Sequence, residues 1–264
     1  TPEENKQLIL TELDRLYPQP KPELHFTNPY ETLVAVMLSA QCTDKQVNKV
    51  TPAVFARFPD VKSMAEADVA ELYPLVKSCG FKSKASNIIA ACRMILAEDG
   101  GEVPHTMEAL TRLPGVGRKT ANVVMSTAFH IPAIAVDTHV FRVSNRLGLV
   151  DAPDVLKTEM QLRALIPQDR WSDAHHWLIF HGRRVCKAQH PLCGEVQQRN
   201  RIPLRPTAPH RQPGVSHAPK RTHNSAFRTP HFPSRRPMLR PERRQKLPPL
   251  LPRVHQRVPL RHIP

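Results

Sequence analysis

The sequence has few cysteines and no long apolar run, and both absences exclude whole classes of protein. Five scattered cysteines among 264 residues exclude a secreted disulfide scaffold and indicate a reducing compartment, so a cytoplasmic location is expected. No stretch approaches the roughly 20 apolar residues that a membrane span needs. The first residues, TPEENK, lack the basic and apolar parts of a secretory signal. We therefore expect neither a membrane segment nor a signal peptide.

The C-terminal segment, residues 197–264, has almost no acidic residues. Glu242 is its one carboxylate, whereas 16 of the chain's 38 lysines and arginines and 14 of its 28 prolines lie there. Its apolar residues follow neither the helical nor the strand period, and its prolines are too frequent for a helix. High charge with little to bury predicts a disordered Pro/Arg-rich tail. A basic arm that binds nucleic acid is the alternative.

Residues 1–196 carry 22 basic and 22 acidic residues, so the chain's net charge of +15 belongs to the tail. The net charge therefore gives no argument that the body of the chain binds nucleic acid. The body is expected to be all-α, because apolar residues recur at helical spacing without a convincing strand pattern. Short turns between helices indicate a helical bundle or two packed helical lobes. Helices are predicted over residues 2–16, 30–38, 84–96, 106–113, 119–129, 137–147, from Ala152–Pro153 onward, and over 171–185, with Thr1 as the first N-cap.

The most informative segment is LPGVGRKT, residues 113–120, which lies between two amphipathic helices. Gly115 and Gly117 allow the backbone to approach a ligand closely because they carry no Cβ atom. The following helix begins near Arg118, so its unpaired N–H groups and the positive end of its dipole lie in the same turn. This arrangement is typical of a phosphate-binding site. A plain connection between two helices is the alternative.

Two titratable residues accompany this turn. Lys119 stands at the start of the second helix, and an amine there could form a Schiff base, although most lysines in first turns are merely solvated. Asp137 is the only acidic residue between Glu108 and Asp151, and an apolar run leads into it. It is expected to cap the next helix, and it could also act as a base or stabilise positive charge. The two roles are compatible.

The segments 113–121, LPGVGRKTA, and 136–140, VDTHV, resemble the helix–hairpin–helix base-excision DNA glycosylases, and closely the endonuclease III family. Residues 38–44, 84–88 and 175–183 agree, and the resemblance runs from about residue 7 to about 194. It implies an all-α fold of two lobes with the catalytic cleft between them. The implied domains are a six-helix barrel over 22–131 with its hairpin at 106–129, a second lobe made of 1–21 and 132–196, and the tail 197–264.

The resemblance also implies residue roles. Lys119 would attack C1′ of the damaged nucleotide, and Asp137 would deprotonate Lys119 or stabilise the oxocarbenium charge. The resulting imine would permit β-elimination at the 3′ phosphate. Gln41 would enter the duplex where the base is flipped out, and Phe81 would be the wedge residue. Further DNA contacts would come from Leu113, Gly115, Val116, Gly117, Arg118, Thr120 and His139. The implied partner of a monomer is double-stranded DNA with damaged pyrimidines or abasic sites.

The sequence departs from this family at its iron–sulfur motif, Cys-x6-Cys-x2-Cys-x5-Cys. Cys186 and Cys193 match the first two ligands, whereas Val196 and Ile202 stand at the third and fourth positions. Two thiolates cannot hold a [4Fe–4S] cluster that needs four, so no intact cluster is expected. The resemblance stops where the tail begins, as a frameshift inside the motif would produce.

Two other functions compete with a glycosylase that is also an abasic-site lyase. One is a non-catalytic DNA-binding protein, in which the altered C-terminus has cost the chain its catalysis. The presence of both Lys119 and Asp137 favours the enzyme. The other is the purine-specific monofunctional branch, whose members resemble this chain at the aspartate and lack the lysine.

Overall fold

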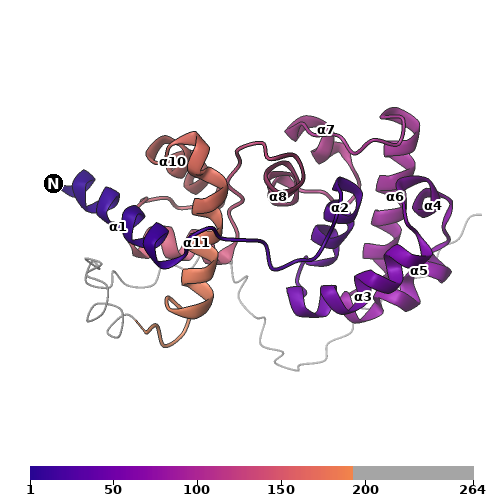
Figure 1. Cartoon of the computed structure of the whole chain (residues 1–264), viewed down its shortest axis with the longest axis horizontal. Coiled ribbons are helices and arrows are strands. Elements are labelled where there is room, and N and C mark those ends of the chain that lie inside the picture. The colour runs from indigo at the N-terminus through magenta and orange to yellow at the C-terminus, as the bar shows by residue number, and fades with distance from the viewer. Residues whose placement is uncertain (193–264) are drawn as a thin grey trace, which may run out of the picture. The chain divides into compact units, whose positions relative to one another are not determined.

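The computed structural model describes residues 1–192, and all regular structure in that range is helical, as predicted (Figure 1). The predicted tail, Cys193, Val196 and Ile202 lie outside the described residues. No helix within the described range is both long and apolar enough to cross a membrane. The α-helices are α1 (Pro2–Leu16), α2 (Pro29–Leu38), α3 (Asp44–Arg57), α4 (Val61–Glu66), α5 (Val69–Val76), α6 (Lys82–Glu98), α7 (Met107–Arg112), α8 (Arg118–Phe129), α9 (Thr138–Arg146), α10 (Val155–Leu165) and α11 (Trp171–Arg184). Two short 3₁₀ helices, η1 (Lys77–Cys79) and η2 (Gln168–Arg170), precede α6 and α11.

Side-chain caps set where several helices begin. Thr1 caps α1 with a capping box that includes Glu4, and Pro2 occupies the first turn, so the predicted start is confirmed. The predicted start of α10 at Ala152–Pro153 is wrong. Asp154 is the N-cap, and its Oδ1 accepts from Lys157 N at 2.8 Å, so the helix begins at Val155. A carboxylate caps a helix far better than the alanine two residues before it.

The first hydrophobic core is built around α2, which packs against α3, α6 and α8 (Figure 1). Every residue of α2 from Thr32 to Leu38 is buried, which explains its nearly continuous apolar sequence. Helices α4, α5 and α7 and residues of the connecting segments complete this core. The Tyr30 hydroxyl donates to the Phe58 carbonyl at 2.8 Å, so the polar atom of this buried ring is satisfied.

A second hydrophobic core joins the N-terminal helix to the C-terminal part of the described chain. Ile9, Leu10 and Leu13 of α1 are buried among residues of α9, α10 and α11. The segment 133–136, which has no regular secondary structure, is also buried and leads into α9. Helices far apart in the sequence therefore share this core. The boundaries 22–131 and 132–196 stay predictions.

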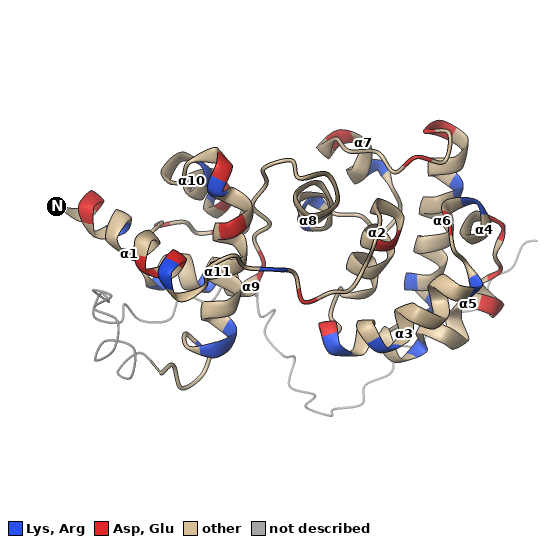
Figure 2. Ribbon diagram, viewed as in Figure 1, with Lys and Arg blue, Asp and Glu red and all other residues tan. Residues whose placement is uncertain are grey.

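Acidic and basic residues are interspersed along the helices of both cores (Figure 2). Between Glu108 and Asp151, however, Asp137 is the only acidic residue, and α8 and α9 carry basic residues alone. Oriented N–H groups at a helix start, together with individual basic side chains, can form an anion site in this part of the molecule.

Candidate active site and nucleic-acid interface

The turn between α7 and α8 is a compact hairpin whose apolar side chains point inward. Leu113 is 3% exposed and Val116 is 5% exposed, and Val116 N donates to the Leu113 carbonyl at 3.0 Å. Gly115 has φ +78°, and a Cβ atom there would lie 2.9 Å from Cβ and Nδ2 of Asn87. Glycine is therefore required at this position by both conformation and space. The side chains of Leu113 and Val116 pack inside the protein beneath this turn. Only the backbone atoms of these two residues are therefore placed to contact DNA.

The start of α8 offers N–H donors to a ligand. Gly117 is the N-cap, no side-chain hydrogen bond caps this helix, and a Cβ at Gly117 would meet nothing within 4 Å. The first N–H groups of a helix have no partner inside the helix. An uncapped, accessible helix start next to a glycine turn is a suitable place for one phosphate group. Thr120, in the same turn, is half-buried.

Lys119 and Asp137 come from different helices. Lys119 is the second residue of α8 and is exposed to solvent. Asp137 is the N-cap of α9, and its Oδ1 accepts from Val140 N at 2.8 Å, which confirms the expected cap. A carboxylate has acceptor capacity beyond this one bond, so the cap leaves Asp137 able to interact with a ligand.

The buried imidazole of His175 in α11 interacts electrostatically with both Lys119 and Asp137. His175 Nδ1 lies 2.8 Å from the Ala135 carbonyl, two residues before Asp137. Burial lowers the pKa of His175 to about 3; the negative charge of Asp137 raises it, and the positive charge of Lys119 lowers it. The ring is therefore neutral at physiological pH, and Lys119 and Asp137 lie within electrostatic reach of the same group. Motif spacing could not identify His175 as part of the site, because this proximity depends on the packing of α11.

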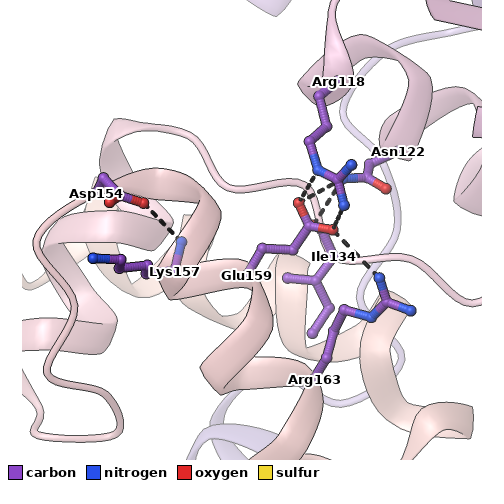
Figure 3. A network of polar contacts seen from close by, with 7 residues as sticks. All are labelled: Arg118, Asn122, Ile134, Asp154, Lys157, Glu159 and Arg163. Carbon is purple, nitrogen blue, oxygen red and sulfur yellow. Dashed lines mark hydrogen bonds and ion pairs between the residues drawn. The ribbon is translucent and has the colours of Figure 1, made fainter.

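A buried carboxylate connects the start of α8 to α10 (Figure 3). The Glu159 side chain is 4% exposed and receives two hydrogen bonds from Arg118, from Nε at 2.8 Å and from Nη2 at 2.7 Å. Asn122 Nδ2 lies 3.3 Å from the same carboxylate and 3.2 Å from the Ile134 carbonyl. Arg163 Nη1 is 3.6 Å away. The bond to Glu159 raises the pKa of Arg118 further, and the DNA contact expected of Arg118 stays a prediction.

The predicted DNA contact His139 lies on α9 and is half-buried against α11. Its Nδ1 is 3.1 Å from Arg142 Nη2, and burial lowers its pKa. Arg142 also donates to the carbonyls of Gly182 and Cys186, at 3.1 and 3.0 Å from Nη2. A Cβ at Gly182 would lie 3.0 Å from the His139 Cβ, so this glycine allows the two helices to pack closely.

Gln41 and Phe81, the residues expected to enter the duplex, lie on two connections. Gln41 is exposed on the α2–α3 loop (residues 39–43) and has φ +56°, an uncommon left-handed conformation. Phe81 ends the α5–α6 loop (residues 77–81) and is 78% exposed. Gln46 Nε2 donates to Ser78 Oγ at 2.8 Å and links the first turn of α3 to the α5–α6 loop.

Arg183 is a further residue that sequence reasoning missed. Its Nη1 contacts the carboxylates of Glu23 and Asp44, the latter at 2.9 Å. It therefore connects α11 to the first turn of α3, next to the α2–α3 loop. The 139 residues between Arg183 and Asp44 explain why no local pattern predicts the pair.

The end of α11 does not supply the ligands of a four-iron cluster. Cys186 is buried, and its Sγ lies 3.7 Å from Arg146 Nη1. Cys193 is the last cysteine of the chain, and aliphatic Val196 and Ile202 stand at the other two positions. A [4Fe–4S] cluster requires four ligating side chains. The residues present do not fit the cluster, and the absence of an intact one stays a prediction.

Comparisons with known proteins agree with this arrangement. The family model described as HhH-GPD superfamily base excision DNA repair protein matches residues 34–168. Endonuclease III of Synechocystis sp. is 52% identical over 191 residues, which cover 72% of this chain and 87% of the relative. Endonuclease III of Escherichia coli is 48% identical over 187 residues, covering 70% of this chain and 89% of the relative.

Solved structures show the same likeness. A non-covalent endonuclease III–DNA complex aligns with a TM-score of 0.71 at 45% identity, covering 76% of this chain and 95% of that one. A trapped endonuclease III–DNA covalent intermediate aligns with a TM-score of 0.69 at 48% identity, covering 72% and 91%. A thermostable thymine-DNA glycosylase, 22% identical with a TM-score of 0.65, shares the fold.

The chain belongs to the HhH-GPD superfamily of base-excision DNA repair proteins. Its relatives at about half identity are endonuclease III proteins, so within that family the chain is a DNA glycosylase of base excision repair.

Proposed function

We propose that this DNA glycosylase removes oxidised or ring-damaged pyrimidines from duplex DNA and cleaves 3′ to the abasic site through a Schiff base on Lys119. The observation that carries the proposal is the placement of an exposed lysine, Lys119, at the uncapped start of α8. The charges of Lys119 and Asp137 both act on the buried ring of His175. The DNA-bound endonuclease III structures support double-stranded DNA as the partner. A monomeric state and a cytoplasmic location stay predictions.

In this mechanism the hairpin holds the DNA backbone while Lys119 reacts. N–H groups of the turn and of the first turn of α8 bind a phosphate, which positions the sugar beside Lys119. A bond forms between Nζ and C1′ as the bond from C1′ to the base breaks, and the base leaves with the electron pair. Asp137 accepts the proton that Nζ loses or stabilises the positive charge that develops on the sugar.

Strand cleavage follows from the imine. Sugar ring opening converts the amine adduct into an imine between Nζ and C1′, and this electron sink makes the proton at C2′ acidic. Removal of that proton and departure of the 3′ phosphate complete a β-elimination. Gln41 and Phe81 are proposed to occupy the space that the flipped nucleotide leaves in the duplex.

Borohydride trapping tests the proposal. Wild-type protein incubated with a duplex that carries one abasic site and with borohydride should give a covalent adduct, because the reductant fixes the imine. The Lys119→Ala variant should give no adduct but keep duplex affinity within about threefold, because the phosphate contacts come from backbone N–H groups. Lys157→Ala removes another exposed lysine from a first helical turn and should trap like the wild type.

The same experiment separates the enzyme from a non-catalytic DNA-binding protein, which the incomplete cluster motif favours. Wild-type protein that binds the abasic duplex without trapping would support that second function. Trapping by Lys119→Ala would instead assign the nucleophile to another amine.

A further inference from the structure

A single ammonium group joins the α2–α3 loop to the α5–α6 loop. Lys84, in the first turn of α6, donates to the Leu38 carbonyl at 2.9 Å and to the Cys79 carbonyl at 2.5 Å. It also donates to the Ala40 carbonyl. A lysine ammonium has three N–H donors. All three are therefore used on backbone oxygens at the end of α2 and in these two loops.

The local backbone is built to admit this side chain. Gly80 has φ +137°, and a Cβ atom at that position would lie 3.2 Å from Cε and Nζ of Lys84. Glycine leaves the path to the three carbonyls open and adopts a conformation that other residues rarely take. The adjacent Cys79 thiol is protonated, because burial raises its pKa to about 11. The positive charge of Lys84 is thus compensated by carbonyl dipoles and not by a carboxylate.

Both loops present to solvent the residue expected to enter DNA. Gln41 directly follows Ala40, whose carbonyl Lys84 holds, and its left-handed conformation needs support from its surroundings. Phe81 follows two residues after Cys79, the other anchor, and is the most exposed large apolar side chain of the described residues. Lys84 therefore fixes the backbone beside each of the two side chains at once.

We propose that Lys84 is a positioning residue for base extrusion, which fixes the spacing of Gln41 and Phe81 so that both enter the duplex together. The inference rests on the proposed function. Because Lys84 already orders the α2–α3 and α5–α6 loops in the free protein, these loops lose less conformational entropy when DNA binds. The smaller entropy loss lowers the barrier to separating a base pair. The benefit is greatest where a paired base must leave the stack and smallest where no base remains.

The test compares Lys84→Met with Lys82→Met on two DNA duplexes. Lys82 lies two residues before Lys84 and is exposed to solvent, so Lys82→Met removes the same charge from a side chain outside the contact network. Single-turnover excision of a thymine glycol paired with adenine should fall by about 10- to 100-fold in Lys84→Met, the scale of loss that misplacement of site residues produces. Borohydride adduct formation at an abasic site should fall by less than about threefold, because no base is extruded. Lys82→Met should match the wild type on both duplexes within about threefold.

Amide hydrogen exchange tests the same inference without any activity. Exchange in residues 38–43 and 77–81 should accelerate in Lys84→Met and not in Lys82→Met, while the rest of the first core stays protected and reports an intact fold. Unchanged exchange in these loops, or equal losses of rate on the two duplexes, would overturn the inference. A wild-type protein inactive on both duplexes would contradict the proposed function, and the exchange data would still decide whether Lys84 fixes the loops.

Discussion

Asp137 holds a helix cap and is proposed to act on the reacting sugar, and one substitution separates these roles. Asp137→Asn should leave the melting temperature within about 2 °C of the wild type, because asparagine caps helices about as well as aspartate. Turnover on an oxidised pyrimidine should fall by about 10²- to 10⁴-fold, the usual size of acid–base assistance. Thermal unfolding and single-turnover excision measure the two effects.

A matched variant shows whether the loss comes from the missing charge at the site or from any change of cap. Asp154→Asn makes the same change at the N-cap of α10, whose Oδ1 also accepts one backbone N–H at 2.8 Å. It should leave both the melting temperature and the rate unchanged. Near wild-type turnover by Asp137→Asn would show that Asp137 only caps α9 and takes no part in catalysis.

At the scale of elements, the buried Glu159 carboxylate determines how α8 meets α10 (Figure 3). Glu159→Gln removes the charge that Arg118 and Arg163 share and should lower the free energy of unfolding by about 1.5–3 kcal/mol, the range for hydrogen bonds to charged groups. Excision should also slow, because the turn that carries Lys119 is fixed less firmly. Urea unfolding and single-turnover kinetics measure these changes.

Glu98→Gln is the matched control at a solvent-exposed ion pair, where Arg112 lies 3.9 Å from the carboxylate. Its effect on unfolding should stay below about 1 kcal/mol, because exposed pairs contribute little. If Glu98→Gln and Glu159→Gln change the free energy of unfolding equally, burial of Glu159 does not strengthen the contact between α8 and α10.

Some of these elements are easier to predict from the sequence than others. The start of α1 and the hairpin were predictable because their signals are local: a Thr-Pro cap, and two glycines next to a proline. Helices α3 and α5 are harder to predict, because Pro52 and Pro74 lie inside them and interrupt the helical pattern. Only packing in the first core overrides that local preference.

The contacts that organise the site were less predictable than the residues themselves. Lys119 and Asp137 stand in distinctive motifs, and their placement on α8 and α9 follows from the neighbouring sequence. The partners of Lys84 at Leu38 and Ala40 lie 46 and 44 residues away, and Glu159 lies 41 residues from Arg118. Contacts over such separations depend on the tertiary fold, and a single sequence carries no local signal for them.

At the scale of the whole molecule, buried and half-buried histidines make the second core sensitive to acid. His139, His175, His176 and His181 all lie on α9 or α11, and burial lowers the pKa of each from the ordinary value of 6.5. The pKa of His181 falls to about 4, and its Nδ1 lies 3.3 Å from the Tyr17 hydroxyl, at the packing of α1 on α11. These rings are neutral in the folded chain at neutral pH.

The direction of the pH dependence follows from these shifts. Between pH 6.5 and about 4, the unfolded chain binds a proton at His181, whereas this histidine stays neutral in the folded chain. Stability is therefore full above pH 6.5 and falls as the pH is lowered toward the folded pKa, by up to about 1.4 kcal/mol per pH unit for each such group. The contribution of His181 stops changing below about pH 4.

Urea unfolding at pH 7.5, 6.5 and 5.5 should show this decline in a range where carboxylates do not yet titrate. His181→Gln should be less stable than the wild type at pH 7.5, because it loses packing and the contact with Tyr17. Its stability should nevertheless fall less steeply toward pH 5.5, because one proton-binding group is gone from the unfolded chain. His25→Gln, at an exposed position, should keep the wild-type slope. If the His181→Gln slope equals that of the wild type, the acid sensitivity of the second core comes from other groups.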